Sequence, residues 1–336
     1  MRIRLLTCHF ISVLVLATSF HARADSFAQR EDVREFIQEM QEKHGFDRER
    51  LVSLFKKAQP QPKAIKAIMP PKDPSVRSWR TYHARFIEPK RIEGGLRFWE
   101  AYGHVLETAR RTYGIPEEII VAIIGIETIY GRNMGRFPAL ATLATLAFDY
   151  PPRADLFRRE LEALLLLSRE AHRNPLAYTG SYAGALGIPQ FLPSSIRNWG
   201  VDFDGDGHVD LTASAADAIG SVANFLASHG WETDSPIAAP AAVAGERYGE
   251  LVDAGILPRL TPLEMAAYGV SYAEDAPQLP CALIDLVTPN FATEYWLGYR
   301  NFYVITRYNR SSFYAMAVHA LSRELRSARE ARLAAR

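Results

Sequence analysis

The feature that most constrains the fold is an almost wholly apolar stretch at residues 116–130, PEEIIVAIIGIETIY. It begins as a helix begins, with Pro116 suited to the first turn and two acids near the positive end of the helix dipole. A helix that is apolar on all sides has to be buried. The stretch therefore predicts a buried core helix.

One carboxylate, Glu127, interrupts this helix near its end. Its neighbours on the same helix face are Ile123, Ile124 and Tyr130. Such surroundings disfavour the charged form of a carboxyl group and raise its pKa. A carboxyl that stays protonated near neutral pH is what a general acid needs. The alternative is a glutamate that merely leaves the core at a helix end, and periodicity alone leaves both possibilities open.

A second candidate site is the acidic segment DFDGDGHVD at residues 202–210. Acids at its positions 1, 3 and 5, with glycine at position 6, match the beginning of an EF-hand calcium loop. Three carboxylates this close repel one another unless a cation gathers them, and Gly207 permits the turn that points the His208 carbonyl inward. The acids at these positions are Asp202, Asp204 and Asp206.

The end of this loop departs from the EF-hand pattern. Position 12 is Ala213, where a bidentate glutamate would be expected. Asp217 follows four residues later and could close a longer loop, or it could take part in a capping box with Ser214. Ion binding is the favoured interpretation of the acidic run, and a solvated turn is the alternative.

A third candidate is the loop GSYAGALGIPQF at residues 180–191. Its glycines allow the backbone to approach a ligand closely. Ser181 and Gln190 can form hydrogen bonds, while Tyr182 and Phe191 offer stacking faces. This mixture suits a carbohydrate, although a plain flexible loop is the default for glycine-rich sequence.

Elsewhere the pattern predicts helices over residues 28–67, 79–111, 139–149, 155–169 and 214–229, and from residue 313 onward. Prolines between residues 60 and 74 indicate a loop, and residues 179–200 indicate a structured loop system. Residues 231–298 have short β-prone segments, such as 282–287, and residues 302–306 form another β-like run. The sequence therefore predicts a mainly α chain with a small β-containing segment.

The first 24 residues have the three parts of a secretory signal peptide. Arg2 and Arg4 precede an apolar run at residues 10–20, and the small residues Ala22 and Ala24 follow it. That run is short for a membrane span, which needs about 20 residues. We therefore expect cleavage after Ala24 and export, with an uncleaved anchor as the alternative. No lipidation cysteine follows the apolar run, and no later stretch is apolar enough to span a bilayer.

Composition excludes several classes of protein. With 48% hydrophobic residues the chain is expected to be globular, and its 39 basic and 38 acidic residues argue against a nucleic-acid binder. The sequence contains no G-x-S-x-G, no P-loop and no H-E-x-x-H motif, and it has no cysteine pair for zinc. No organic cofactor is therefore expected.

Five segments in this order resemble the lytic murein transglycosylase B family: residues 127–131, 180–191, 201–210, 217–224 and 301–309. The likeness runs from about residue 75 to about residue 321. It implies a lysozyme-like catalytic core at residues 113–230, with the EF-hand-like loop at 202–217. A helical domain at residues 25–112 and a small β domain at residues 231–298 would flank this core, and residues 299–336 would return to it.

The resemblance also implies a function. The family cleaves the β-1,4 bond between N-acetylmuramic acid and N-acetylglucosamine in the glycan strands of peptidoglycan, in the periplasm, and forms 1,6-anhydromuramoyl ends. Glu127 falls on the catalytic glutamate, which protonates the leaving oxygen and then acts as the base. The residues that match substrate contacts are Tyr82, Arg153, Ser181, Gln190, Phe225, Tyr308 and Asn309, although Phe225 stands where a relative has tyrosine.

The same resemblance implies a structural calcium ion. Asp202, Asp204, Asp206, His208 and Asp217 fall on the family's EF-hand-like ion site, in a loop longer than the common form. The resemblance supports the site without fixing which ion it binds.

Two alternative functions remain open at this point. A muramidase would deliver water to the same bond, and a catalytically silent module would only bind peptidoglycan or calcium. Most glycosidases use two carboxyl groups. The next acid after Glu127 is Asp149, which has no obvious matching role. Attack by the substrate's own N-acetyl oxygen or C6 hydroxyl would supply the missing nucleophile.

Overall fold

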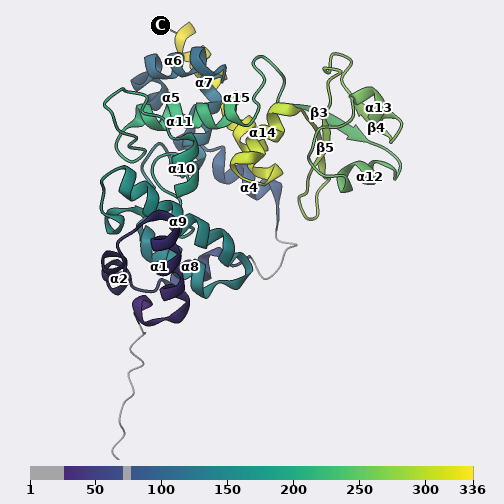
Figure 1. The fold of residues 1–336 in the computed structure, drawn as a ribbon. Coiled ribbons are helices and arrows are strands. Elements are labelled where there is room, and N and C mark those ends of the chain that lie inside the picture. The colour runs from purple at the N-terminus through teal and green to yellow at the C-terminus, as the bar shows by residue number, and fades with distance from the viewer. Residues whose placement is uncertain (1–25, 71–76, 336) are drawn as a thin grey trace, which may run out of the picture.

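The computed structural model describes residues 26–70 and 77–335, so the predicted signal peptide at residues 1–24 lies outside the described part of the chain. Helices dominate the described residues, and their strands form one small two-stranded sheet and one four-stranded sheet. The prediction of a mainly α chain is confirmed. Figure 1 shows the sheet set to one side of the helices.

The first helices of the chain pack against two later ones. Residues 31–68 form α1 (Glu31–His44), α2 (Arg48–Lys57) and α3 (Pro62–Ile68), and this group lies beside α8 (Ala139–Asp149) and α9 (Ala154–Glu170) (Figure 1). Ion pairs join the two groups, from Arg158 to Glu39 at 2.7 Å and from His44 to Glu162 at 2.7 Å. Short 3₁₀ turns at Phe27–Gln29, Pro151–Arg153 and Pro175–Ala177 connect these elements.

Helix α7 (Glu117–Thr128) is the central helix of the molecule. Residues 119–124 are at most 1% exposed, which confirms the predicted buried helix. It ends two residues earlier than expected because Ile129 and Tyr130 have left-handed backbone conformations. Around it pack α5 (Pro89–Ala101), α6 (Gly103–Tyr113), α11 (Ala215–Ser228) and α15 (Ser312–Ala334), with α4 (Trp79–Phe86) against α15.

This packing divides the helical domain expected at residues 25–112. Helices α1–α3 pack with α8 and α9, whereas α4–α6 pack around α7, α11 and α15. The domain boundaries drawn from the resemblance remain a prediction.

The four-stranded sheet and its small helices form the sheet lobe, residues 238–298. Its antiparallel strands lie in the order β4-β3-β6-β5, with Ile284 of β5 opposite Trp296 of β6. Leu283 faces the lobe's own core, whereas Ile284 packs into the main core, so this sheet is covered on both faces. The elements are β3 (Ala238–Val243), α12 (Tyr248–Asp253), α13 (Pro262–Ala266), β4 (Val270–Tyr272), β5 (Ala282–Leu286) and β6 (Glu294–Gly298).

A single buried side chain fastens the chain where it leaves and re-enters the core. Asn301 lies in α14 (Arg300–Tyr308) and is fully buried. Its Nδ2 donates to the carbonyls of Glu232 at 2.8 Å and Ser235 at 3.0 Å, and its Oδ1 accepts from the Glu232 N–H at 2.9 Å. The outgoing and returning segments are therefore held together at the base of the sheet lobe.

Two sequence predictions of local structure are wrong. The β-like run at residues 302–306 lies within α14, because a short apolar run reads the same in a buried helix as in a strand. Residues 179–200 include a helix, α10 (Pro193–Trp199), where a structured loop system was expected. Its proline occupies the first turn, where it begins a helix instead of interrupting one. Helix α3 lies at the end of residues 28–67, which were predicted as helical, although the prolines from residue 60 onward also indicated a loop.

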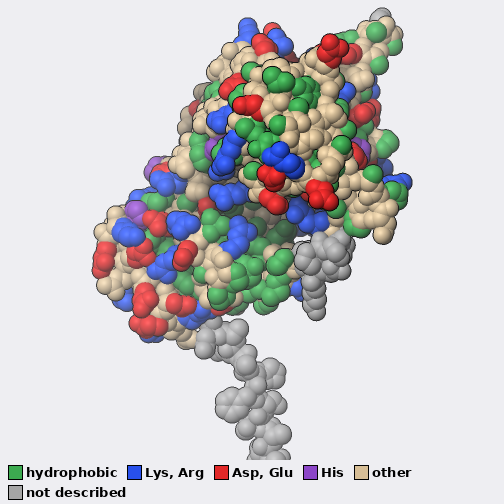
Figure 2. All heavy atoms as spheres, turned by 90° about the vertical axis from the view of Figure 1, so that its right-hand side faces the viewer, with side chains coloured by type: hydrophobic (Ala, Val, Ile, Leu, Met, Phe, Trp, Pro, Cys, Tyr) green, Lys and Arg blue, Asp and Glu red, His purple; other side chains and the backbone are tan. Residues whose placement is uncertain are grey.

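The surface that carries the sheet lobe shows charges of both signs. Figure 2 shows Lys and Arg interspersed with Asp and Glu on this face, so it presents no broad region of one charge. Among the described residues, none of the helices combines the length and the apolar composition that crossing a bilayer requires.

Candidate active site

Glu127 lies in the last turn of α7, where the backbone changes direction sharply. The three residues Ile129, Tyr130 and Gly131 have φ values of 53°, 60° and 80°. The left-handed conformation is unfavourable for Ile and Tyr, and such residues persist where surrounding contacts impose them. Thr128 supplies two of these contacts, since its Oγ1 donates to the Ile188 carbonyl at 2.8 Å and accepts from the Gly131 N–H at 2.9 Å.

The ring of Tyr130 wedges between α5 and α7 and fixes the end of the helix. Its hydroxyl donates to the Arg91 carbonyl at 2.9 Å. A Cβ atom on either Gly95 or Gly125 would lie only 2.5 Å from that hydroxyl oxygen. Glycine at these two positions is therefore what allows α5 and α7 to enclose the ring.

A buried arginine connects three helices behind the same turn. Arg91 donates from Nε to the Gly125 carbonyl at 3.0 Å and from Nη1 to the Arg85 carbonyl at 2.7 Å. Burial lowers the pKa of this guanidinium. Its bonds reach carbonyls at the ends of α4 and α7, and the Gly125 carbonyl also accepts from the Ile129 N–H at 3.2 Å.

The Glu127 carboxyl group is half-buried and has one direct side-chain partner. The Tyr314 hydroxyl, at the start of α15, donates to Glu127 Oε1 at 2.6 Å. Burial raises the pKa of Glu127 from 4.5 to about 7, and the hydrogen bond from Tyr314 opposes that shift. A carboxyl with this pKa can both give and take a proton near neutral pH.

No other described acid contributes to the pKa of Glu127. Asp149, the next acid along the chain, forms an ion pair with Arg30 at the end of α8. The site therefore holds one carboxyl group where most glycosidases hold two.

Aromatic rings surround this carboxyl group. The rings of Tyr308 and Tyr314 are nearly parallel, with centroids 6.2 Å apart and an interplanar angle of 12°. The Tyr308 hydroxyl donates to the Pro189 carbonyl, which joins α14 to the 180–191 loop. Burial raises the pKa of Tyr82 to about 12, and the nearby Glu127 adds to that shift. Tyr82 and Tyr308 thus lie near Glu127.

The loop at residues 180–191 is ordered by its own hydrogen bonds. Ser181 Oγ accepts from the N–H groups of Ala183 at 3.3 Å and Ala185 at 3.1 Å. Gln190 has a φ of 53°, and its Nε2 donates to the carbonyls of Met134 at 3.1 Å and Gly187 at 2.9 Å. Strands β1 (Phe137–Pro138) and β2 (Thr179–Gly180) pair at the base of this loop, next to the segment that follows Glu127.

Three of the residues expected to contact substrate lie less directly at the site. Phe225 is 5% exposed, and its ring packs against Tyr308 at 5.0 Å, so it supports that ring from behind. Arg153 is exposed, with its guanidinium over the Phe157 ring at 5.4 Å. Asn309 is exposed at the end of α14. Their roles stay predictions.

Tyr314 is the residue that sequence reasoning missed. It is separated from Glu127 by 187 positions, and the sequence of the helix that begins near residue 313 does not indicate a functional role for this tyrosine. Only the packing of α15 against α7 brings its hydroxyl to the carboxyl group.

The acidic loop forms a second site at the start of α11. Carboxylate oxygens of Asp202, Asp204 and Asp217 all lie within 4.8 Å of one another. Such a set of oxygen donors fits a hard cation such as Ca²⁺. The side chains of Asp206 and His208 lie outside this group, and for His208 the expected ligand was its backbone carbonyl.

Asp217 holds the two ends of this loop together. It is 1% exposed, and its carboxylate accepts from the N–H groups of Phe203 at 2.9 Å and Asp210 at 2.8 Å. Ser214 caps α11 by accepting from the Asp217 N–H at 3.1 Å. The Asp217 side chain thus serves the loop, and the serine alone caps the helix.

Comparison with known proteins gives a consistent result. The family described as "Transglycosylase SLT domain" matches residues 28–323. Membrane-bound lytic murein transglycosylase B of Escherichia coli (strain K12) is 39% identical over 312 residues, which cover 90% of this chain and 85% of that protein.

Solved structures share the fold. The soluble lytic transglycosylase SltB1 of Pseudomonas aeruginosa is 44% identical with a TM-score of 0.83, covering 89% of this chain and 99% of that one. The Escherichia coli lytic transglycosylase Slt35 in complex with calcium is 38% identical with a TM-score of 0.78, covering 90% of this chain and 93% of that one.

Proposed function

This chain belongs to the transglycosylase SLT family, and from that membership we propose that Glu127 is the single acid–base group of its reaction on peptidoglycan. The protein is an enzyme, a lytic murein transglycosylase with a lysozyme-like fold. The observation that carries the proposal is one half-buried carboxyl group with a pKa near 7 and no described acid beside it.

The reaction follows from this one group. Protonated Glu127 gives its proton to the oxygen of the β-1,4 bond, and the N-acetylglucosamine side leaves. The muramic acid residue passes through an oxocarbenium-like state, and its own C6 hydroxyl attacks C1, directly or after the N-acetyl oxygen. The Glu127 carboxylate then takes the hydroxyl proton, which restores the enzyme and forms the 1,6-anhydro ring.

An internal nucleophile has a large advantage here. An intramolecular attack can have an effective molarity of about 10⁵ M or more. The packed rings of Tyr82, Tyr308 and Tyr314 limit the access of water to the carboxyl group. The Tyr314 hydrogen bond holds the carboxyl in one orientation while its charge changes.

The product distinguishes a transglycosylase from a muramidase. Purified sacculi digested in ¹⁸O-labelled water should release muropeptides that end in anhydromuramic acid and carry no label. Reducing muramic ends that carry ¹⁸O would reject the transglycosylase mechanism in favour of hydrolysis.

A matched pair of variants tests the role of Glu127. Glu127→Gln keeps the shape but has no acidic proton, and we expect kcat to fall by more than about 100-fold. Glu107→Gln removes an exposed carboxyl on α6 and should leave kcat unchanged. Near-normal turnover by Glu127→Gln, or release of no soluble product by the wild type, would overturn the assignment.

We propose in addition that the acidic loop binds a structural calcium ion. The support is the carboxylate group of Asp202, Asp204 and Asp217 together with the calcium complex of Slt35. Calcium at 100-fold over its Kd would stabilise the folded protein by about 2.7 kcal/mol and raise Tm by roughly 5 °C. Asp202→Asn should abolish this rise and Asp253→Asn, outside the loop, should keep it. An equal Tm with and without calcium would reject the ion.

We also propose that residues 1–24 direct export to the periplasm. The support is the basic, apolar and small-residue pattern of this segment, together with a substrate that lies outside the cytoplasm. The mass of the protein recovered from a periplasmic extract should correspond to residues 25–336. An intact N-terminus in the membrane fraction would indicate an uncleaved anchor.

A further inference from the structure

A wide cavity lies on the side of α15 that faces away from Tyr314. Its volume is about 820 Å³, and its walls come from α4, α15, β6 and the connection between β5 and β6. Arg323 follows Tyr314 by nine residues, which is about two and a half helical turns, so the two side chains leave opposite faces of α15. Glu127 does not line this cavity.

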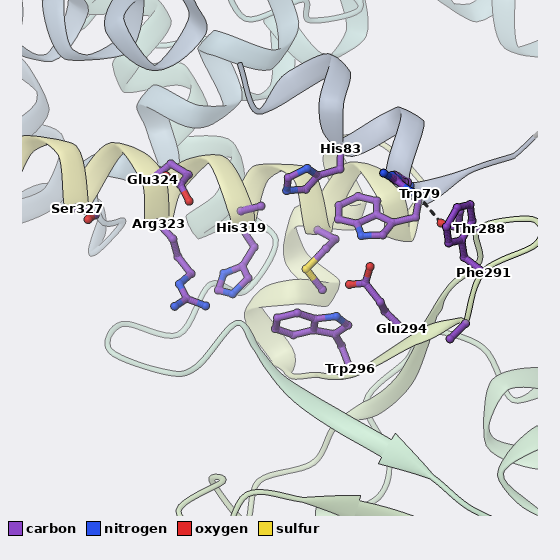
Figure 3. Close-up of a pocket in the computed structure, with 14 residues that line it drawn as sticks. Trp79, His83, Thr288, Phe291, Glu294, Trp296, His319, Arg323, Glu324 and Ser327 are labelled. Atoms are coloured by element: carbon purple, nitrogen blue, oxygen red, sulfur yellow. Dashed lines mark hydrogen bonds between the residues drawn. The ribbon is translucent and has the colours of Figure 1, made fainter. Parts of the chain in front are cut away.

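Aromatic side chains form the walls at one end of the cavity. Figure 3 shows the indoles of Trp79 and Trp296 on opposite sides, with the Glu294 carboxylate extending between them. Trp79 also stacks against Tyr82, with centroids 6.4 Å apart.

Charged groups of both signs face the cavity without ion-pair partners. Arg80, Arg323, Glu294 and Glu324 line it, and none of them forms an ion pair with another described residue. Arg80 lies over the Phe291 ring at 4.9 Å. In Figure 3, Glu294 lies near the two indoles and Arg323 lies beside His319 toward the other end. Glu294 and Arg323 thus lie toward opposite ends of the cavity, and Arg80 over Phe291 and Glu324 next to Arg323 add a charge of the other sign at each end.

An adjoining cavity of about 630 Å³ continues along α15 and shares His319, Arg323 and Ser327 with the first. Two buried side-chain nitrogens in the described part of the chain have no hydrogen-bond partner, Trp231 Nε1 and His319 Nδ1, and both residues line this second cavity. Buried polar atoms are nearly always paired, so two orphans in one place call for an explanation. An indole N–H can only donate, so its missing partner is an acceptor such as a carbonyl or carboxylate.

From these observations we propose that the trough formed by the two cavities binds the peptide stem of peptidoglycan, with a stem ammonium group at Glu294 and the indoles and a stem carboxylate at Arg323. The proposal rests on the proposed function, which supplies a substrate whose glycan carries short peptides. A peptide has the required features together: unlike charges separated along an extended chain, small apolar groups, and carbonyls that can accept from Trp231. A bare glycan strand of neutral hydroxyls offers no charged group to the exposed side chains of Glu294 and Arg323.

A binding experiment tests the two charged contacts directly. The probe is a free murein tetrapeptide, titrated into the wild type by calorimetry. We expect Glu294→Gln and Arg323→Gln each to raise Kd by about tenfold. Glu274→Gln and Arg259→Gln change the same charges on exposed positions of the sheet lobe outside the trough, and they should bind as the wild type does.

A modified peptide identifies which charge meets which residue. Acetylation of the stem amine should weaken binding to the wild type, and Glu294→Gln should then have no further effect. Arg323→Gln should still weaken the acetylated peptide. Equal losses for both peptides with Glu294→Gln would overturn the assignment of the ammonium group, and no binding at millimolar peptide would overturn the proposal.

Turnover separates this proposal from the catalytic one. On stemmed murein the two trough variants should raise KM with kcat unchanged, and on strands stripped of stems by an amidase they should match the wild type. Equal losses on stripped strands would make the trough a glycan site and reject the peptide. If the trough variants also raise KM on soluble uncrosslinked strands, the bound stem belongs to the strand that is being cleaved. If they raise KM only on sacculi, the stem belongs to a neighbouring strand.

Glu127→Gln should still bind the tetrapeptide with the Kd of the wild type. Stem binding and the catalytic mechanism can therefore fail independently of each other.

Discussion

At the scale of single residues, two opposing influences set the proton affinity of Glu127. Burial raises its pKa to about 7, while the hydroxyl of Tyr314 stabilises the ionised form and pulls the value down. The balance matters for the proposed mechanism, in which the same group loses a proton in one step and recovers it in the next. The hydroxyl also restricts the carboxyl to one orientation.

Removal of that hydroxyl should therefore change the pH profile as well as the rate. In Tyr314→Phe the ring stays packed against Tyr308 but the hydrogen bond to Glu127 is lost. The pKa of Glu127 should rise, so the alkaline limb of kcat/KM should move to higher pH. We expect kcat to fall by about tenfold, equivalent to about 1.4 kcal/mol in the barrier. An unshifted alkaline limb would show that the hydroxyl does not act on this carboxyl.

The raised pKa of Glu127 also predicts a pH-dependent loss of stability. Below pH 4.5 the carboxyl is protonated in both the folded and the unfolded protein, so the shift has no effect there. Between pH 4.5 and about 7 the folded protein holds the proton more tightly, so the free energy of unfolding decreases as pH rises, and above 7 the loss is complete. The full loss is at most about 3 kcal/mol.

Glu127→Gln removes this titration. The free energy of unfolding of the variant, minus that of the wild type, should therefore increase as pH rises from 4.5 to 7. Urea denaturation at several pH values measures this difference. Glu107→Gln should follow the wild type throughout. A constant difference between Glu127→Gln and the wild type at every pH would contradict the raised pKa.

The prediction of a raised pKa for Glu127 came from local helix periodicity, because the apolar neighbours one turn away belong to the same helix. Periodicity alone left open a glutamate that leaves the core at the helix end, and the burial that raises the pKa is seen only in the folded structure. The partner Tyr314 could not be inferred, since its position depends on how α15 packs against α7. Asp217 was found in the sequence, but its bonds to Phe203 and Asp210 required the folded loop.

At the scale of elements, the end of α7 depends on a close approach between helices. The Tyr130 ring occupies space that side chains at Gly95 and Gly125 would otherwise fill, and Arg91 bonds to the Gly125 carbonyl from behind. Because Glu127 lies two residues after Gly125, we expect a displacement at this glycine to move the Glu127 carboxyl group.

Gly125→Ala tests this arrangement. The added Cβ would lie 2.5 Å from the Tyr130 hydroxyl oxygen and 2.7 Å from Cζ, so the ring or the helix must shift. We expect a loss of about 1–3 kcal/mol in the free energy of unfolding, together with a lower kcat. Gly103→Ala adds a Cβ with no atom within 4 Å and should be neutral or slightly stabilising. Full stability of Gly125→Ala would show that the contact yields easily.

Long periodic helices were predicted well, and short elements were not. Helix α8 matches its predicted range, because its apolar pattern extends over three turns. Residues 302–306 carry β-branched and aromatic side chains but fold as a helix, because packing against the core overrides their strand propensity. The sheet itself was placed correctly by its change in composition, and its strand order could be known only from the structure.

At the scale of the whole molecule, the sheet lobe is an insertion that is attached to the core at two places. The chain leaves after α11 and returns in α14, and Asn301 bonds to the outgoing segment at Glu232 and Ser235. The second of these attachments is at α4, where the backbone N–H of Trp79 donates to the Val287 carbonyl at 2.9 Å. These two attachments fix one wall of the cavity shown in Figure 3.

Asn301→Ala should weaken the first attachment. The substitution leaves two carbonyls and one N–H near the lobe base without their side-chain partner, which costs at least about 2 kcal/mol. Urea denaturation should show this loss, and limited proteolysis should cut faster within residues 231–237. Asn198→Ala, at an exposed position of α10, is the control and should have little effect. An unchanged cleavage rate would mean that other contacts hold the base.

The points of departure and return lie so near each other that Arg300 Nε donates to the Gly230 carbonyl at 3.3 Å. The sheet lobe is thus a long insertion between α11 and α14, two helices of the core whose facing ends lie close together. A different insertion at this place would replace Trp296 and Glu294 and would leave Glu127 and Tyr314 where they are. Such modularity would let one catalytic unit acquire new preferences for the decoration of its polymer without altering the chemistry.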